Sequence, residues 1–330
     1  MENLPRMESM EGLSGKKILV TGAAGFVGSH LVKKLVLENA KVVGLDFRID
    51  EKSYFVTEKI YKSCKFEIAD IRDRAVLRNV FRKHRFDYIV HLAAQTIVTN
   101  AYIDPYETFT TNIMGTVNIL EEFRRSGTAK RIVVASSDKA YGKSAKTYSE
   151  SQPLKGDHPY DVSKSSADLI SHTYFKTYDL PVVVTRSGNI YGEGDLHFDR
   201  LIPGICKAVF TDSTLVIRSD GKYVRDYLYV GDIVDGYLTL LSAGDDINGQ
   251  AYNFTAKDNL SVLEVVKLAE KTLKKKIKIK IENSVKNEIP FQHLSGKKFK
   301  KLGYSKKTSL GKILPDVYLW YANYLGQSIL

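Results

Sequence analysis

The sequence predicts an α/β protein built on a doubly wound parallel sheet, with a smaller lobe toward the C-terminal end. Three observations indicate this fold. Short β-branched runs alternate with amphipathic stretches of helix length, a glycine-rich turn follows the first run, and the alternation breaks up after Gly188. Strands that alternate with helices form parallel sheets covered on both faces, because each crossover helix packs against the sheet.

The alternation runs from residue 17 to residue 187. The predicted strands are KILVT (17–21), KVVGLD (41–46), CKFEIAD (64–70), DYIVHLAA (87–94), RIVVASS (131–137) and PVVVTRS (181–187). The predicted helices cover residues 28–38, 73–84, 106–126 and 160–178, where apolar residues recur at helical spacing. Beyond Gly188, the segment RLIPG and other mixed segments predict a second lobe laid across the carboxyl ends of the strands.

The net charge of +11 does not indicate a nucleic-acid-binding protein. The excess lies mostly in KTLKKKIKIK (271–280) and KKFKK (297–301). These runs lack interleaved aromatic platforms and a recognised nucleic-acid motif, so they predict a solvated face that attracts small anions.

Membrane and metal sites are also not expected. No stretch approaches the roughly 18 apolar residues of a membrane span, and the N-terminus lacks the apolar core of a secretory signal, so we expect a cytoplasmic protein. The two cysteines, Cys64 and Cys206, are far apart, and the seven histidines are scattered. This spacing predicts neither a disulfide framework nor a metal site.

The first predicted turn has the pattern of a dinucleotide site. In KKILVTGAAGFVGSHLVKKL (16–35) a strand, a glycine turn and a helix start follow in order. The glycines let the backbone turn and approach a pyrophosphate, and the helix N-terminus supplies amide donors. The predicted cofactor residues of this turn are Gly22, Gly25, Phe26, Val27 and Gly28.

Three further positions fit a bound dinucleotide in a Rossmann fold. Asp46 ends the next strand, where its carboxylate can accept hydrogen bonds from the adenosine ribose hydroxyls and would repel the 2′-phosphate of NADP. Asp46 therefore favours NAD, whereas the positive charge of Arg48 leaves NADP open as an alternative. Asp70 and Ile71 end the third strand, where they could hold the adenine. The fourth strand ends in small residues that permit close backbone approach, which adds Leu92, Ala93, Ala94 and Gln95.

Tyr160 and Lys164 are one helical turn apart, so both side chains lie on one face of the predicted helix. An ammonium close to a phenol, assisted by a positively charged nicotinamide, lowers the pKa of the phenol, and Tyr160 can then accept a proton from a hydroxyl. Ser137, at the end of the preceding strand, is expected to share the substrate oxygen. A surface tyrosine and lysine with this spacing by chance is the alternative.

Together these motifs, with DPYETFTTNIMGTVNILE (104–121) and RDYLYVGDIVDGYL (225–238), resemble the extended short-chain dehydrogenase/reductase family of nucleotide-sugar epimerases and dehydratases. The resemblance covers about residues 16–305. Within the family, SSDKAYG (136–142) and SGNIYGEGDLHFDRLIPG (187–204) look most like the CDP-glucose 4,6-dehydratase branch. The resemblance implies NAD as cofactor and a nucleoside-diphosphate sugar as substrate.

The resemblance also implies a reaction. Tyr160 would accept the proton as carbon 4 of the hexose is oxidised, Asp138 would protonate the departing carbon 6 hydroxyl, and Lys139 would take the carbon 5 proton. The hydride would then return to carbon 6, leaving a 4-keto-6-deoxy sugar. In the alternative, Asp138 and Lys139 merely pair with each other or with neighbouring charges. A 4-epimerase, a related oxidase or reductase, and a non-catalytic NAD-sensing regulator are the other functions considered.

By resemblance, the substrate residues are Thr96, Asn189, Arg200, Leu201 and Arg225. Arg225 could instead form an ion pair with an acid such as Asp226 or Asp232. The stretches RDYLY and LKGDHPYDVSK depart from the CDP-glucose branch, so GDP-, UDP- and dTDP-linked sugars stay open.

The domain boundaries follow from these motifs. We expect a flexible tail at 1–15, the NAD-binding domain at 16–188, rejoined by about 223–254, and a nucleotide-sugar lobe at 189–222 and 255–330. Wide apolar helix faces, with Phe109, Ile113, Ile170 and Tyr174, resemble a four-helix dimer interface and predict a homodimer, with ordinary core as the alternative.

Overall fold

The computed structural model describes residues 10–144, 146–284, 289–305 and 308–327, and its centre is a seven-stranded parallel sheet. The strand order is β10-β6-β5-β4-β1-β2-β3. The strands are β1 Lys17–Thr21, β2 Lys41–Asp46, β3 Lys65–Ile68, β4 Tyr88–His91, β5 Arg131–Ala135, β6 Val182–Ser187 and β10 Ala251–Phe254. The predicted doubly wound parallel sheet is confirmed.

The strand register places several strand ends at one edge of the sheet. Thr21, at the end of β1, is level with Leu45 of β2 on one side and His91 of β4 on the other. From β1 the chain adds β2 and β3 on one side of the sheet, and then β4, β5 and β6 on the other side. The direction in which strands are added therefore reverses between β1 and β4, and the crossover helices on the two sides lead away from this point. Open α/β sheets bind ligands at such a switch point, outside the carboxyl ends of the strands.

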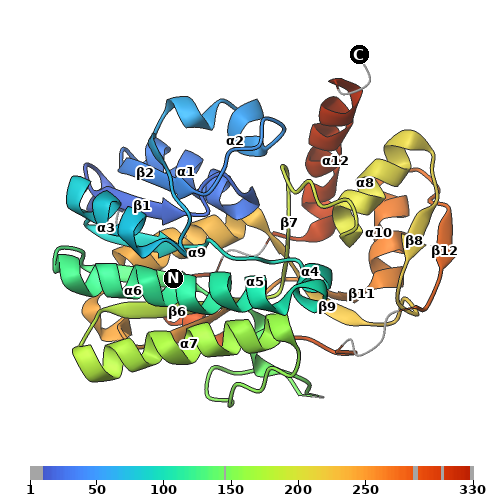
Figure 1. Cartoon of the computed structure of the whole chain (residues 1–330). Helices are drawn as coiled ribbons and strands as arrows, with labels where there is room; N and C mark the ends of the chain where they lie inside the picture. The colour runs from blue at the N-terminus through green and yellow to red at the C-terminus, as the bar shows by residue number, and fades with distance from the viewer. Residues whose placement is uncertain (1–9, 145, 285–288, 306–307, 328–330) are drawn as a thin grey trace, which may run out of the picture.

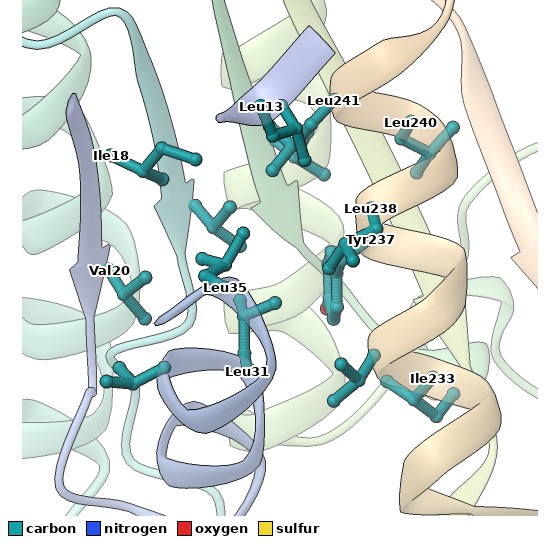
Figure 2. Packing of buried hydrophobic residues seen from close by; sticks show 14 of the residues in the cluster. Leu13, Ile18, Val20, Leu31, Leu35, Ile233, Tyr237, Leu238, Leu240 and Leu241 are labelled. Atoms are coloured by element: carbon teal, nitrogen blue, oxygen red, sulfur yellow. The ribbon is translucent and has the colours of Figure 1, made fainter. Parts of the chain in front are cut away.

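Two layers of helices cover the sheet (Figure 1). On one face, α1 (Phe26–Leu37) packs against α9 (Val230–Ser242). Figure 2 shows Leu31 and Leu35 of α1 in the same buried cluster as Ile233 and Tyr237 of α9. On the other face, α3 (Arg74–Lys83), α6 (Gly115–Ser126) and α7 (Pro159–Tyr178) form a second apolar cluster with the sheet.

The helix predicted at 106–126 is not continuous in the structure. It consists of α5 (Pro105–Phe109), a π-helical turn (Thr110–Met114) and α6, and a short α4 (Val98–Ile103) precedes it. The Asp104 side chain caps α5 by accepting from Glu107 N at 2.8 Å. π turns inside helices redirect a side chain and are frequent at functional sites. Here the turn buries Asn112.

The N-terminal segment differs from the expected flexible tail at 1–15. Residues 1–9 lie outside the described residues, but Met10–Leu13 forms a 3₁₀ turn. Leu13 is fully buried in the cluster that contains α1 and α9 (Figure 2), and Gly15 N donates to Asn39 O at 2.9 Å. Residues 10–15 therefore belong to the folded body, because the apolar Leu13 completes its core.

A second region lies beside the carboxyl ends of the strands. It has its own apolar cluster and contains α8 (Leu201–Thr211), β8 (Leu215–Ile217), α10 (Val262–Leu273), β12 (Ile279–Ile281) and α12 (Leu310–Gln327). A small sheet, in the order β11 (Asn259–Ser261), β9 (Val224–Tyr229) and β7 (Asn189–Tyr191), lies between the two regions. Short helices complete the described chain, namely α2 (Tyr54–Thr57) and α11 (Lys297–Lys300).

The expected return to the main sheet at about 223–254 is divided in the structure. β9 pairs with β7 and β11 in the small sheet, whereas α9 and β10 return to the main sheet. Within the residues that the structure describes, no helix has the length and apolar character needed to cross a membrane.

Candidate active site

The glycine turn after β1 leaves no room for a side chain at Gly22 or Gly28. Gly22 has a φ of +71°, and a Cβ placed on it would lie 2.8 Å from Ala93 N. A Cβ on Gly28 would lie 1.9 Å from Gly22 O. Gly25 is the N-cap of α1 and offers no side-chain cap, so the first amides of the helix stay available to an anion. This backbone cradle, with Phe26 and Val27 opening α1, fits the pyrophosphate of NAD.

Asp46 lies directly beside this turn. Its carboxylate accepts from Ala24 N at 3.1 Å and from Phe47 N at 2.9 Å. Burial raises the pKa of Asp46, and these amides together with Arg48 offset part of the rise. Arg48 itself is exposed, and its guanidinium lies 5.1 Å from the centre of the Phe47 ring.

The ends of β3 and β4 form the rest of the expected cofactor region. Asp70 forms an ion pair with Arg72 at 2.6 Å, which lowers the pKa of Asp70, and Ile71 is buried. Thr21 Oγ1 accepts from Leu92 N and Ala93 N, both at 3.2 Å, so β1 and the residues after β4 are joined. Ala94 and Gln95 are half-buried, and Thr96 is exposed.

Ser137, Tyr160 and Lys164 come together where β5 ends against α7. The Ser137 hydroxyl lies close enough to Tyr160 to lower its pKa, and the Lys164 ammonium donates to Ala135 O at 3.0 Å. Burial lowers the pKa of Lys164 to about 8. Burial and the Asp138 charge raise the pKa of Tyr160, whereas Arg200 and the Ser137 hydroxyl lower it.

Arg200, a residue of the second region, is thus among the groups that lower the pKa of Tyr160, and this effect was not predicted from the sequence. The predicted effect of Lys164 on Tyr160 stays a prediction.

Asp138 and Lys139 follow Ser137 on a 3₁₀ turn, Asp138–Tyr141. Asp138 is buried, and its Oδ1 accepts from Ser137 Oγ at 3.0 Å and from Lys139 Nζ at 3.3 Å. The Lys139 side chain keeps about a fifth of its surface exposed, with a relative exposure of 22%. The two charges therefore pair with each other, and Asp138 also holds the Ser137 hydroxyl.

The predicted substrate residues lie at different distances from this centre. Asn189 is exposed at the start of β7. Arg200 is the N-cap of α8, pairs with Asp195 at 3.2 Å and acts on Tyr160, and Leu201 follows it as the first residue of α8. Arg225 is buried in β9, where its guanidinium donates to Val224 O at 2.9 Å and lies against the Tyr223 ring.

Sequence reasoning missed two buried residues of this region. Asn112, in the π turn, accepts from Gln95 N at 2.7 Å and donates to Ser163 Oγ at 2.9 Å, so it ties the end of β4 to the helix of Tyr160. Asn112 gave no clear signal, because polar threonines surround it in the stretch TFTTNIMGT (108–116). Asp161 is completely buried beside Tyr160, and its signal was an acid directly after the tyrosine of the Tyr160 and Lys164 pair.

Comparisons with known proteins agree with this geometry. Residues 19–316 match the family model described as GDP-mannose 4,6 dehydratase. A dTDP-glucose 4,6-dehydratase from Neisseria meningitidis is 33% identical over 76% of this chain and 74% of its own length. A trifunctional UDP-glucose 4,6-dehydratase, epimerase and reductase from Arabidopsis thaliana is 31% identical over 94% of this chain.

The chain spans 48% of the Arabidopsis protein and 63% of a dTDP-D-glucose 4,6-dehydratase from Dictyostelium discoideum. Among solved structures, the dTDP-glucose 4,6-dehydratase of Streptomyces venezuelae, which contains NAD, matches with a TM-score of 0.84 and 28% identity. That match covers 94% of this chain and 98% of the other.

The UDP-glucuronic acid 4-epimerase of Bacillus cereus, with UDP-glucuronic acid and NAD, matches with a TM-score of 0.85 and 28% identity. It covers 93% of this chain and 99% of the other. The glycine cradle, the Ser137, Tyr160 and Lys164 grouping and the family match over most of the chain agree. The chain belongs to the NAD-dependent nucleotide-sugar dehydratase and epimerase family of extended short-chain dehydrogenases/reductases.

Proposed function

We propose that this chain is a nucleotide-sugar 4,6-dehydratase that converts a nucleoside-diphosphate hexose to its 4-keto-6-deoxy product. The relatives reported above are named for dTDP- or UDP-linked sugars. We therefore propose a dTDP- or UDP-glucose type of substrate in place of the CDP-glucose type expected from the sequence.

NAD supplies a hydride acceptor and donor when bound, and the chain's own residues would hold it at the switch point of the sheet. The turn around Gly22 and Gly28 admits no side chain at either position, as expected where the backbone itself would hold a pyrophosphate. Asp46, with its carboxylate fixed by two backbone amides, would accept the ribose hydroxyls.

Tyr160 would accept the proton of the carbon 4 hydroxyl. Since burial and Asp138 raise the pKa of Tyr160, the phenolate needs positive charge nearby, which Arg200 provides from the second region. Ser137 would share the same sugar oxygen through its hydroxyl. Lys164, anchored on Ala135 O, would complete the positive side of the site.

The contact that carries the proposal is the Asp138–Lys139 pair beside Ser137. A proton that moves from Lys139 Nζ to Asp138 Oδ1, 3.3 Å away, leaves a neutral amine and a carboxylic acid. These are the base and the acid that elimination across carbons 5 and 6 requires. The amine takes the carbon 5 proton, and the acid protonates the hydroxyl that leaves carbon 6 as water.

The proton inventory of this scheme closes through Lys139 and Ser137. As carbon 6 is reduced, Lys139 gives its proton back to carbon 5. Tyr160 has then gained one proton at carbon 4, and Asp138 has lost one to the departing water. Ser137, which lies close enough to Tyr160 to lower its pKa, donates to Asp138 Oδ1 at 3.0 Å and would pass the proton from Tyr160 back to Asp138, which resets both residues.

A 4-epimerase is the second candidate, because the Bacillus cereus 4-epimerase shares the fold at a TM-score of 0.85. Product masses separate the two functions. Incubation with dTDP-glucose, UDP-glucose, CDP-glucose and UDP-glucuronic acid should give a product lighter by one water from the preferred substrate. A product of unchanged mass, inverted at carbon 4, would identify an epimerase.

The base assignment has its own test. Lys139→Met should abolish entry of solvent deuterium at carbon 5 while carbon 4 oxidation continues. Lys143→Met is the matched control, because Lys143 follows on the same segment and pairs with Asp157 at the surface. Unchanged exchange in Lys139→Met would remove Lys139 from the base role.

We also propose a homodimer formed through α4 to α7. Ile103, Tyr106, Met114 and Leu169 are large apolar side chains that are more than half exposed on these helices. Of the residues expected at the interface, Phe109, Ile113 and Ile170 are half-buried, whereas Tyr174 is buried and its hydroxyl donates to Glu121 at 2.9 Å. In analytical ultracentrifugation, the unaltered protein should sediment as a dimer, and the Ile103→Asp and Leu169→Asp variants should sediment as monomers.

A further inference from the structure

A buried tyrosine ends the turn that carries the Asp138–Lys139 pair, and it has no part in the reaction described above. The 3₁₀ turn Asp138–Tyr141 follows Ser137, and the Tyr141 side chain is buried. Asp138 accepts from Lys139 and from Ser137, so these bonds stay within the turn and its N-cap. A single 3₁₀ turn has poor hydrogen-bond geometry and holds its own shape weakly. The position of the acid and the base therefore depends on what anchors the turn.

The Tyr141 hydroxyl bonds to two strands of the main sheet. Arg186 Nη1, on β6, donates to the Tyr141 hydroxyl at 2.8 Å. The same hydroxyl donates to Asn253 Oδ1, on β10, at 2.8 Å. Burial raises the pKa of Tyr141 to about 12, so the hydroxyl keeps its proton and serves as donor and acceptor at once. Tyr141 thus fixes the end of the turn to β6 and β10.

Arg186, the donor to Tyr141, is itself held on both sides. Its Nε and Nη2 donate to the two carboxylate oxygens of Asp168, on α7, at 2.7 Å and 3.0 Å. Such bidentate charged pairs are strong and geometrically specific. Burial opposes the Arg186 charge, but Asp168 and Tyr141 together raise the pKa of Arg186 above its ordinary value, so it stays a cation. The anchor of Tyr141 therefore joins β6 to α7, the helix of Tyr160.

A second tyrosine extends the anchor beyond the turn. The rings of Tyr141 and Tyr148 are stacked, with centroids 4.9 Å apart, and the Tyr148 hydroxyl donates to Gly142 O at 2.7 Å. Tyr148 forms a parallel bridge with Leu294. The Leu294 amide donates to Asp226 Oδ2, on β9, at 2.8 Å. The end of the turn is thereby held to the small sheet as well as to the main sheet.

The groups that act at carbon 4 are held without Tyr141. Ser136 N donates to Thr185 O at 2.7 Å, which continues the pairing of β5 with β6 up to the residue before Ser137. Tyr160 lies on α7, a helix of 20 residues. Loss of the Tyr141 hydroxyl should therefore loosen Asp138 and Lys139 and leave Ser137 and Tyr160 in place.

We propose that Tyr141 is a positioning residue, whose buried hydroxyl holds the Asp138–Lys139 turn in the orientation that elimination requires. The inference rests on the proposed function, in which Lys139 and Asp138 act on neighbouring carbons of one sugar. Both groups must then be held closely, since a misplacement of about 1 Å can lower a rate roughly 100-fold. Tyr141 acts through this pair, so it affects the elimination and not the first oxidation.

Tyr141→Phe tests the proposal, because it keeps the ring and its stack on Tyr148 and removes only the hydroxyl. We expect deuterium entry at carbon 5 to fall about 10- to 100-fold. Carbon 4 oxidation, followed by nicotinamide absorbance on mixing with substrate, should keep its rate, and KM should not change. Tyr148→Phe loses only the bond to Gly142 O and should lower carbon 5 exchange by a smaller factor.

Tyr304→Phe is the matched control. The Tyr304 hydroxyl is also buried and donates to Asp232 O at 2.7 Å, so the same atom and the same kind of bond are lost elsewhere in the protein. This variant should lose thermal stability much as Tyr141→Phe does, and both rates should stay unchanged. Unchanged carbon 5 exchange in Tyr141→Phe, or an equal loss of exchange and of carbon 4 oxidation, would overturn the positioning role.

A second readout needs no substrate. Ala140 N donates to Ser137 O at 3.2 Å and Gly142 N donates to Lys139 O at 3.0 Å, and these two bonds close the turn. Tyr141→Phe should speed hydrogen exchange of both amides about tenfold, the factor expected for one lost hydrogen bond, and Tyr304→Phe should not. Unchanged protection in Tyr141→Phe would overturn the proposal. An unaltered protein that oxidises carbon 4 and never exchanges carbon 5 would instead overturn the dehydratase assignment, while amide exchange would still show whether Tyr141 fixes the turn.

Discussion

The two halves of the binding edge of the sheet are built on different principles. At the ends of β1, β2 and β4, the backbone passes so close to itself that Gly22 and Gly28 admit no side chain. At the end of β5, the site consists of buried ionisable groups: Asp138, Tyr160, Asp161 and Lys164. Substitutions at the glycines of the first half should therefore impair binding and stability through steric overlap, at every pH. Substitutions in the second half should act through charge, so their effects should depend on pH.

Gly28→Val should have the largest effect, because its Cβ alone would lie 1.9 Å from Gly22 O. Overpacking a rigid site costs about 1–3 kcal/mol or more, and here the colliding atom is backbone. We expect NAD binding to be lost in calorimetric titration and thermal stability to fall. Gly12→Ala is the control, since its Cβ would meet nothing within 4 Å. Retained NAD binding in Gly28→Val would contradict the steric account.

Tyr160→Phe should leave the fold intact and lower turnover by roughly 10²–10⁴-fold, the range for removal of a general acid or base. The variant loses only a hydroxyl, so NAD binding measured by calorimetry should match the unaltered protein. If turnover persisted at its original rate, Tyr160 would not be the group that accepts the carbon 4 proton.

Lys164→Met should stabilise the protein at neutral pH while abolishing turnover. Burial lowers the pKa of Lys164 to about 8 from 10.5, so folding disfavours the ammonium. The resulting stability is present above pH 10.5 and is lost as the pH falls through about 8, and this loss amounts to about 3 kcal/mol. Denaturant unfolding at both ends of that range should show the pH dependence in the unaltered protein and its absence in the variant.

Asp70→Asn should have the smallest effect, although it also removes a charge. Arg72 lowers the pKa of Asp70, so the pair contributes stability above 3.8 that is lost as the pH falls through the lowered value. About a third of the carboxylate side chain is exposed, and partly exposed pairs contribute about 0.2–1 kcal/mol. Unfolding at neutral pH should show a change within this range. A larger change would show that charge matters in the cofactor half as well.

The same contrast explains what the sequence could predict. Gly22, Gly25 and Gly28 are recognisable because the turn restricts the residue type at each position, and the six predicted strands in the first 187 residues lie where the structure has β1 to β6. Ser137, Asp138 and Lys139 follow one strand directly, so their meeting with Tyr160 and Lys164 could be expected from the order of βα units.

Features that depend on distant contacts could not be predicted. The effect of Arg200 on Tyr160 depends on how α8 lies against the main sheet, and the burial of Leu13 depends on α9, more than 200 residues later. The π turn at Asn112 has no periodic signature in one sequence. The dTDP or UDP type of the proposed substrate came from relatives and not from any residue of the second region.

The edge strand β10, Ala251–Phe254, has a consequence for synthesis of the chain. The glycine turn and the proposed catalytic residues are all synthesised before residue 165, but β6 has no outer neighbour until β10 is made. The helix α9, which covers α1, is also made late. The nascent protein must therefore carry the unpaired outer edge of β6 from residue 187 to residue 251, and the bare apolar face of α1 from residue 37 to residue 230. Chaperones should bind the nascent chain most strongly while both are exposed.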